Sequence, residues 1–342
     1  MINLFSDTQT RPTEGMRRAM YEAEVGDEQR LADPTTNALQ EGVAGLLGHE
    51  AGLFLPSGTM CNEIAFRLHI GPGGDEAIVD RTAHPLQFEA SGPAALSGAL
   101  LSPLDGDGGI FTAEQVEGAV RPPGDRYAPR TRLVSVEQTT NIGGGRVWPI
   151  ETIGAVLDVA RAHGLRTHMD GARLFNAVVA SGVPAAEHAS GFDTAWVDFT
   201  KGLGAPIGAV LVGSRELIEE AWRYKQMWGG AMRQSGVVAA AGLYALDHHV
   251  ERLADDHENA RLLAQGLAQI EGVTIDPERV ETNIVIFEVP DAVRVGEDLR
   301  SAGVQVTRLD ARRIRAVTHL DVDRAGIERA LELMRAVISE AA

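Results

Sequence analysis

The stretch Thr167-His168-Met169-Asp170-Gly171-Ala172-Arg173 decides how the rest of this sequence folds. It follows a helical pattern at Ile150–His163, which Gly164 ends as a C-terminal glycine. Arg166–Asp170 then has the short apolar character of a buried strand that ends on an acid. Ligand sites of α/β proteins lie at the carboxyl ends of such strands, so Asp170 is either a helix-capping residue or part of a ligand site.

The alternation of strands and helices extends on both sides of this stretch. Seven strands are predicted, at Gly52–Leu55, Ala77–Asp80, Leu100–Leu104, Arg132–Glu137, Arg166–Asp170, Ala195–Phe199 and Gly208–Gly213. Amphipathic helical patterns separate several of them. The sequence therefore predicts an α/β fold of three layers with a mostly parallel seven-stranded sheet.

The pattern changes after Ser214. Long helices are predicted at Glu216–Tyr224 and Gly236–Ile270, and a shorter α+β pattern follows. Its predicted strands and helices are Thr282–Val289, Val304–Arg308, Arg313–Val317, Val293–Ala302 and Arg324–Ala341. We expect a large domain over residues 1–240 and a smaller C-terminal α+β domain over residues 241–342.

Composition excludes several classes of protein. The 342 residues carry 48 acidic and 31 basic side chains, a formal net charge of −17, which argues against nucleic acid as a partner. The single cysteine, Cys61, excludes an intrachain disulfide and a cysteine-based zinc site. No apolar run approaches the ~18 residues of a membrane span, and no metal-ligand cluster is evident. We expect a soluble cytoplasmic protein with no membrane partner and no metal.

Lysine is almost absent, since 29 of the 31 basic residues are arginine and only Lys201 and Lys225 remain. Base-composition bias explains the missing lysines but not the two that remain. Arginine cannot form a Schiff base, so a lysine with a covalent task cannot be replaced. Lys201 follows the strand Ala195–Phe199, which neighbours the strand that ends at Asp170. This pair suits pyridoxal phosphate, which needs an amine and a carboxylate, although a plain salt bridge is the alternative.

A third feature is the turn Pro56-Ser57-Gly58-Thr59-Met60, between a predicted strand and a predicted helix. Small residues there present free backbone N–H groups and a hydroxyl at the positive end of a helix, which suits a phosphate group. An ordinary helix N-cap has the same appearance. Together with Asp170 and Lys201 it completes a set of contacts for the cofactor.

At this point the sequence resembles the low-specificity L-threonine aldolases, a family of pyridoxal phosphate enzymes of the aspartate-aminotransferase type. The resemblance covers nearly the whole chain. It rests on ordered matches that include Ser6-Asp7-Thr8, Asp33-Pro34-Thr35, the turn at 56–60, Asp170-Gly171-Ala172-Arg173, Lys201-Gly202-Leu203-Gly204, Met232-Arg233-Gln234 and Val317-Thr318-His319. It implies a fold like that of the pyridoxal phosphate-dependent transferases.

The resemblance implies a role for each matching residue. Lys201 would bond covalently to the cofactor, and Asp170 would contact its pyridine nitrogen. His84 would stack on the ring and handle protons. The phosphate would be held by Gly58 and Thr59, with Arg233 reaching in from a neighbouring subunit. The substrate carboxylate would be received by Ser6, Arg173 and Arg315, with Arg173 also close to the cofactor.

Three positions depart from the family's pattern. Thr140 stands where the family usually has a histidine that contacts the β-hydroxyl group. As a substrate-binding residue Thr140 can hydrogen-bond that hydroxyl group but cannot accept its proton, which leaves His84 or a water as the base. Arg30-Leu31-Ala32 replaces the family's Tyr-Gly-Glu. Arg30 either lies in the pocket for the substrate side chain and favours acidic or larger side chains, or belongs to a loop that faces solvent. Gln226 replaces a lysine. Lys225 beside it is either a displaced substitute for that lysine or a surface residue at a helix end. We favour the second interpretation and expect exchange of Lys225 for arginine to be tolerated.

The resemblance implies retro-aldol cleavage of L-threonine, L-allo-threonine or related β-hydroxy-α-amino acids into glycine and an aldehyde. The alternative is a β-eliminating lyase or dehydratase that uses the same cofactor on a β-substituted amino acid. A non-catalytic homologue is a third interpretation, which the intact Lys201 and Asp170 oppose. The family's active sites lie between subunits, which implies a homodimer or homotetramer.

Overall fold

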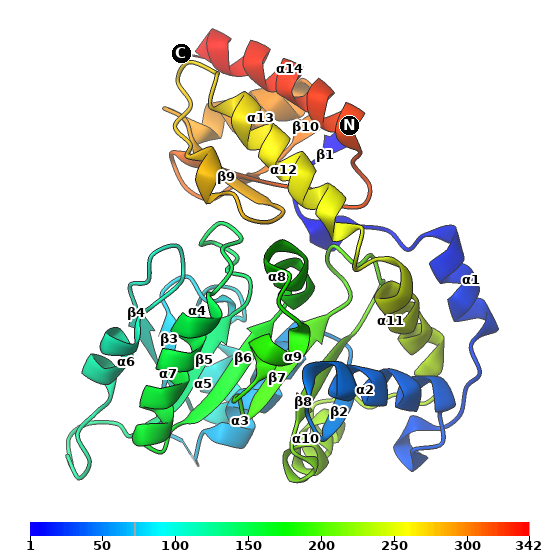
Figure 1. Cartoon of the computed structure of the whole chain (residues 1–342), viewed down its shortest axis with the longest axis vertical. Coiled ribbons are helices and arrows are strands. Elements are labelled where there is room, and N and C mark those ends of the chain that lie inside the picture. The colour runs from blue at the N-terminus through cyan, green and yellow to red at the C-terminus, as the bar shows by residue number, and fades with distance from the viewer. Residues whose placement is uncertain (72, 342) are drawn as a thin grey trace.

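A computed structural model describes residues 1–71 and 73–341 of the chain (Figure 1). Its centre is a seven-stranded sheet in the order β2-β8-β7-β6-β5-β3-β4, in which only β8 runs against its neighbours. All seven predicted strands are confirmed, within one residue at each end. The sheet strands are β2 (Ala51–Leu55), β3 (Glu76–Asp80), β4 (Leu100–Leu104), β5 (Thr131–Glu137), β6 (Arg166–Gly171), β7 (Thr194–Asp198) and β8 (Ala209–Gly213).

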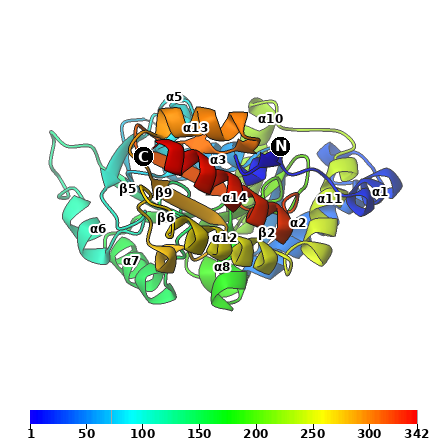
Figure 2. The ribbon, with the colours of Figure 1, turned by 90° about the horizontal axis from the view of Figure 1, so that it is seen from above.

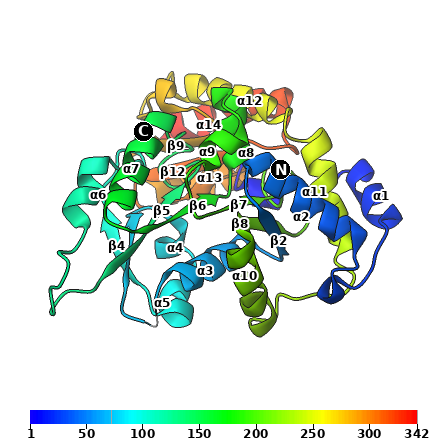
Figure 3. The same ribbon diagram turned by 60° about the horizontal axis from the view of Figure 1, so that its bottom comes forward.

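Helices cover both faces of this sheet, as Figure 3 shows. The strands read as continuous apolar runs because side chains on both faces are buried. In β3, Ile78 belongs to the core under α2, α7 and α8, whereas Ala77 and Val79 belong to the opposite face. The helices of this part are α1 (Glu14–Glu22), α2 (Pro34–Leu47), α3 (Gly58–His69), α4 (His84–Gln87), α5 (Gly92–Ser97), α6 (Ala113–Ala119), α7 (Ile150–Ala162), α8 (Leu174–Ser181), α9 (Ala185–Ala189), α10 (Arg215–Met227) and α11 (Gly236–His248).

A smaller α+β unit lies over the carboxyl ends of the large sheet (Figures 1 and 2). Its three-stranded sheet has the order β11-β12-β9 and packs against α12, α13 and α14 around a core of its own. The elements are α12 (Leu253–Leu267), β9 (Ile284–Glu288), α13 (Ala292–Ser301), β10 (Val304–Gln305), β11 (Thr307–Arg308), β12 (Arg313–Val317) and α14 (Arg324–Ala341), with short 3-10 turns at Asp7–Gln9, Glu28–Arg30 and Pro277–Arg279. No helix in the described part of the chain is long and apolar enough to cross a membrane.

The start of the chain belongs to this smaller unit. Strand β1 (Ile2–Asn3) runs parallel to β10, with Ile2 opposite Val304, and Leu4 is buried in the same core. Asp7 then contacts both units, because it pairs with Arg173, which follows β6, and accepts a hydrogen bond of 3.0 Å from the side-chain amide of Asn283, which precedes β9. Residues from the first and last parts of the sequence therefore meet above the ends of β6 and β7.

The single long helix predicted over residues 236–270 is wrong, because the chain forms two helices there. Helix α11 ends at His248, and the next residue, His249, donates a hydrogen bond of 2.7 Å from Nδ1 to the carbonyl oxygen of Leu203. That contact holds the chain where it turns toward α12. The predicted domain boundary at 240/241 falls inside α11, whose Ala241 and Ala245 pack into the core of the large body.

The expectation of a surface-exposed Lys225 is also wrong. This residue lies in the last turn of α10 and is completely buried, with Nζ 3.0 Å from Oε2 of Glu28 and 4.6 Å from the centre of the Trp222 ring. Glu28 is itself buried and accepts a hydrogen bond from the backbone of Met232. The helical pattern could not show this, because the loop that carries Glu28 comes from a distant part of the sequence.

Replacing Lys225 by methionine leaves the Glu28 carboxylate buried without a counter-charge. We expect Lys225→Met to lower the free energy of unfolding by about 3–5 kcal/mol in urea titrations. Arg223→Met, at an exposed position on the same helix, should change it by less than about 0.5 kcal/mol. Equal stability of Lys225→Met and the wild type would contradict a structural role for this pair. Lys225→Arg, which must fit a larger head group into the same closed space, should also be destabilising.

Candidate active site

Two adjoining cavities lie at the carboxyl ends of β6 and β7. The inner cavity, about 390 Å³, is lined by residues that include Gly58, Thr59, His84, Asp170 and Lys201. The outer cavity, about 670 Å³, is lined by residues that include Ser6, Arg173 and Arg315. His84 and Lys201 line both cavities, so the two form one site. The structure thus brings together eight of the residues that the sequence singled out.

The turn before α3 closes one end of the inner cavity. Ser57 is the N-cap of α3, and its hydroxyl accepts a hydrogen bond of 3.2 Å from the backbone N–H of Met60. Gly58 has no room for a side chain, because a Cβ atom there would lie 2.2 Å from the Trp196 ring. The free N–H groups at the start of this helix therefore face a cavity that is also lined by a lysine and a carboxylate. An ordinary N-cap has no such neighbours.

Asp170 is almost completely buried at the end of β6. One carboxylate oxygen accepts hydrogen bonds from the side-chain amide of Asn62 at 2.8 Å, and the other from the backbone N–H of Ala172 at 3.0 Å. Burial raises the pKa of this carboxyl, while His84 and Asn62 oppose the shift. Asn62 is held in turn by Trp196, whose indole N–H donates to its amide oxygen at 2.7 Å.

Lys201 follows the end of β7 and extends into both cavities. Its Nζ pairs with Asp198, the last residue of β7, and lies 5.5 Å from the centre of the Trp196 ring. The salt bridge considered from the sequence, between Lys201 and Asp170, is therefore not the one that forms. The hydroxyl of Thr10 donates to the backbone carbonyl of Lys201 at 2.7 Å and fixes this turn to the N-terminal segment.

His84 lies at the junction of the two cavities, with a third of its side chain exposed. Its Nδ1 is 2.7 Å from Oε1 of the buried Glu89, which leaves Nε2 as the nitrogen without this partner. Burial opposes a positive charge on the ring, but the hydrogen bond to Glu89 and the nearby carboxylate of Asp170 raise the pKa of His84 above its usual value. The imidazole is thus a stronger base than an exposed histidine.

The outer cavity has a guanidinium group with a free edge. Arg315, on β12, donates to the side-chain oxygen of Asn141 at 2.6 Å through Nη1, and its buried Nε has no partner among the described residues. Arg173 is different, because its Nε and Nη2 both donate to the carboxylate of the buried Asp7, at 2.7 and 2.6 Å. That pairing holds the pKa of Asp7 well below its usual range despite burial. Arg315 is consequently the better receptor for a carboxylate.

Three predicted site residues do not reach these cavities within one chain. Thr140 is completely buried, and its hydroxyl accepts a hydrogen bond of 3.1 Å from the backbone N–H of Arg146. Arg30 and Arg233 are both largely exposed and both face Asp27, at 3.9 and 3.5 Å. The family resemblance places Arg233 in a neighbouring subunit, which a single chain does not contain.

Four polar residues of the site were not predicted from the sequence, namely Asn62, Glu89, Glu137 and Asp198. Glu137 and Asp198 end β5 and β7, so their position at strand ends is the same signal that identified Asp170. Burial and the neighbouring Asp170 raise the pKa of Glu137 to about 7. Asn62 and Glu89 lie in or after helices, where no local pattern shows that their side chains point into the site.

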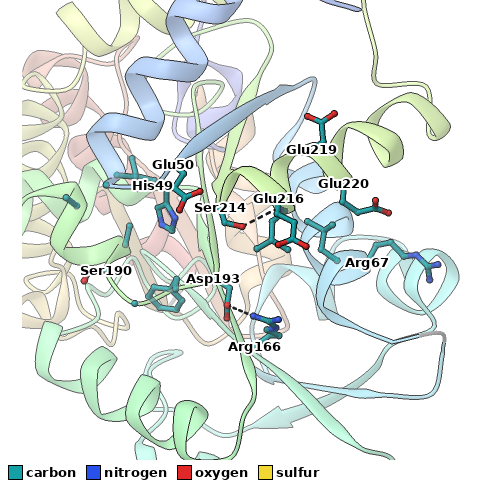
Figure 4. Close-up of a pocket in the computed structure, with 18 of the residues that line it drawn as sticks. His49, Glu50, Arg67, Arg166, Ser190, Asp193, Ser214, Glu216, Glu219 and Glu220 are labelled. Carbon is teal, nitrogen blue, oxygen red and sulfur yellow. Dashed lines mark hydrogen bonds and ion pairs between the residues drawn. The ribbon is translucent and has the colours of Figure 1, made fainter. Parts of the chain in front are cut away.

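A larger cavity lies elsewhere in the molecule. It occupies about 1210 Å³ at the opposite edge of the sheet, where β6 and β7 begin, and is lined by residues such as His49, Arg166 and Asp193 (Figure 4). Arg166 and Asp193 are paired there at 2.9 Å. It contains no lysine. Nor do the residues in 1–71 and 73–341 include a group of three or more His, Cys, Asp or Glu placed to hold a metal ion.

Comparison with known proteins identifies the family. Residues 3–291 match the β-eliminating lyase family. The low-specificity L-threonine aldolase of Escherichia coli K12 is 40% identical over 342 residues, which cover 99% of this chain and 100% of that protein. Low-specificity L-threonine aldolase 1 of Arabidopsis thaliana is 39% identical over 337 residues, which cover 96% and 94%. The chain belongs to this family of lyases.

The threonine aldolase family also has this fold. A solved threonine aldolase from Leishmania major superposes with a TM-score of 0.82 at 18% identity, covering 98% of this chain and 99% of that one. The resemblance stated from the sequence motifs is confirmed, and so is the α/β fold class. The inner cavity of this family member fits pyridoxal phosphate, because an amine, a buried carboxylate and the start of a helix line one space.

Lys201→Ala and Lys201→Arg should both remove the visible absorption band that appears when pyridoxal phosphate bonds covalently to the protein. Alanine has no amine, and arginine keeps the positive charge but cannot form the bond. Absorption spectra of the purified proteins with added cofactor test this. The arginine variant separates the loss of the bond from the loss of charge, and a band in either variant would show that another amine carries the cofactor.

Proposed function

We propose that this chain is a pyridoxal phosphate-dependent aldolase that cleaves L-threonine, L-allo-threonine or related β-hydroxy-α-amino acids into glycine and an aldehyde. The observation that supports this best is the joined pair of cavities, in which Lys201 and Asp170 adjoin a guanidinium able to receive a carboxylate. The relatives at 39–40% identity over nearly the full length are named low-specificity L-threonine aldolases.

The inner cavity supplies each contact that the cofactor needs. Lys201 would provide the amine, Asp170 the carboxylate for the ring nitrogen, and Gly58 and Thr59 the N–H groups and hydroxyl for the phosphate. Bound pyridoxal phosphate supplies an electron sink that stabilises negative charge at the α-carbon of an amino acid. The buried amide of Asn62 keeps Asp170 in place, because it satisfies one oxygen without filling the cavity.

The outer cavity orients the substrate. Arg315 has a free Nε edge and would hold the α-carboxylate, with Ser6 beside it and Arg173 stabilised by Asp7. Fixing this carboxylate would fix the orientation of the α-carbon in the site. The position of the guanidinium would therefore help to decide which bond at that carbon is broken.

His84 would accept the proton of the β-hydroxyl group. Its Nδ1 is held by Glu89, so Nε2 is the atom available for proton transfer, and the raised pKa of the imidazole makes it a competent base. Thr140, which replaces the family's histidine, has its hydroxyl engaged with the backbone of Arg146. His84 is thus the base favoured by the arrangement, with a water molecule as the alternative.

The proposal includes assembly into a homodimer or homotetramer in the cytoplasm. Arg233 and Arg30 lie away from the cavities of their own chain and are exposed, as residues that serve a second copy would be. Cys61 is buried and unpaired, which suits a reducing compartment.

The reaction products distinguish the two candidate activities. Purified enzyme with pyridoxal phosphate should form glycine and acetaldehyde from L-threonine and L-allo-threonine, and glycine and benzaldehyde from phenylserine. A β-eliminating lyase would instead release ammonia and a 2-keto acid, from serine as well as from threonine. Assaying glycine, aldehyde, ammonia and keto acid in parallel decides the matter, and the aldolase assignment fails if no β-hydroxy substrate yields glycine.

The pH profile tests the role of His84. A base must be unprotonated, so activity should rise with pH through the pKa of His84, which lies above its ordinary value of 6.5. Glu89→Gln removes a negative charge that helps to raise the pKa of His84. The acidic limb of the kcat/KM profile should therefore move to lower pH.

The control for this experiment is Glu117→Gln. Glu117 is paired with His163 at 2.9 Å, outside both cavities, so the substitution removes the same charge from a similar pair. Its profile should match that of the wild type. An acidic limb that stays in place in Glu89→Gln would assign the proton transfer to a group other than His84.

A further inference from the structure

The outer cavity is strongly basic within a strongly acidic protein. Its lining includes five arginines and Lys201, but Glu137 is its only acidic residue. Burial and Asp170 raise the pKa of Glu137 to about 7, so even this carboxyl is partly uncharged at neutral pH. The whole chain, by contrast, carries a net charge of −17. Such a contrast favours the entry of anionic molecules.

One amino acid carboxylate does not account for these charges. Arg315, with its free Nε, suffices for an α-carboxylate, and Arg173 is neutralised by the buried Asp7. Lys201 is assigned to the cofactor. Arg81, Arg308 and Arg313 then remain around the outer part of the cavity without a role in the reaction proposed above.

Arg313 is the best placed of the three. It lies two residues before Arg315 on β12, so both side chains project from the same face of the strand, about 7 Å apart along it. Its only ion pair in the described part of the chain is with Asp310, at 2.6 Å, and both side chains are more than 40% exposed. Exposed pairs of this kind contribute little, so Arg313 is available to another carboxylate.

We propose that the outer cavity selects β-hydroxy-α-amino acids that carry a second carboxylate on the β-substituent, and that Arg313 binds this carboxylate while Arg315 binds the α-carboxylate. Two guanidinium groups on one face of a strand match the two ends of a short dicarboxylic amino acid. The inference rests on the aldolase function proposed above and names its substrate class.

The simplest substrate of this class is 3-hydroxyaspartate. Its Cα–Cβ bond would break as the β-hydroxyl group loses its proton and becomes the carbonyl group of the product. The electron pair left at the α-carbon would form a new C–H bond with a proton. The products are glycine and glyoxylate, and no oxidant or reductant is required.

The test compares kcat and KM for glycine formation from the two diastereomers of 3-hydroxy-L-aspartate and from L-threonine and L-allo-threonine. With the better diastereomer, wild-type kcat/KM should exceed that for threonine by about tenfold or more, the value of one charge-assisted contact. Arg313→Gln should abolish this preference, chiefly by raising KM for the dicarboxylate. Arg313→Lys, which keeps the charge but not the two-pronged geometry, should retain part of it.

Arg312→Gln is the matched control. Arg312 precedes Arg313 in the chain, faces Glu288 at 3.7 Å and does not line the outer cavity, so its loss removes a charge without removing the contact. The preference should stay within twofold of the wild type. An equal loss of preference in both glutamine variants, or no preference in the wild type, overturns the inference and leaves the aldolase function standing. Absence of glycine from every substrate overturns the aldolase function as well.

Discussion

The burial of the Asp170 carboxylate is the constraint on which the rest of the site depends. A carboxylate in the interior needs hydrogen-bond donors, and the fold supplies them from two distant segments, the helix that carries Asn62 and the turn at Ala172. Asn62 in turn requires Trp196 on the neighbouring strand, and the ring of Trp196 leaves space only for glycine at position 58. The turn before α3, the Asp170 carboxylate and the central sheet therefore depend on one another, and none of them can shift without the others.

The sequence predicts those parts of the molecule whose causes are local. Buried strands of a parallel sheet are continuous apolar runs, so all seven were found, and strand ends identified Asp170 and Lys201. What depends on packing between distant segments was missed or wrong. The helical pattern near Lys225 could not show that a loop from the start of the chain covers it, and nothing local marks Asn62 as a contact of the buried acid. Arg315 was predicted only through the family resemblance, because the neighbouring sequence alone indicates a surface arginine.

Charge is distributed unevenly over the molecule in a way that its total does not show. Acidic residues dominate the chain, while arginines gather at the outer cavity, where low-dielectric walls strengthen their field. Within that field Arg173 and Asp7 neutralise one another, and Arg315 keeps a free edge. The site therefore combines a fixed pair, which sets the shape of the cavity, with groups that remain open to a ligand.

The pairing of β1 with β10 means that the first strand of the chain can form only after a strand near the C-terminus has been synthesised. Ile2 finds its partner only when Val304 has been synthesised, so the segment that carries Ser6 and Asp7 leaves the ribosome long before it can take its final position. Asp7, the counter-charge of the buried Arg173, lies in this segment. The last eighth of the sequence is thus required to complete a site whose cofactor contacts all precede it, and truncation from either end should abolish the same cavity.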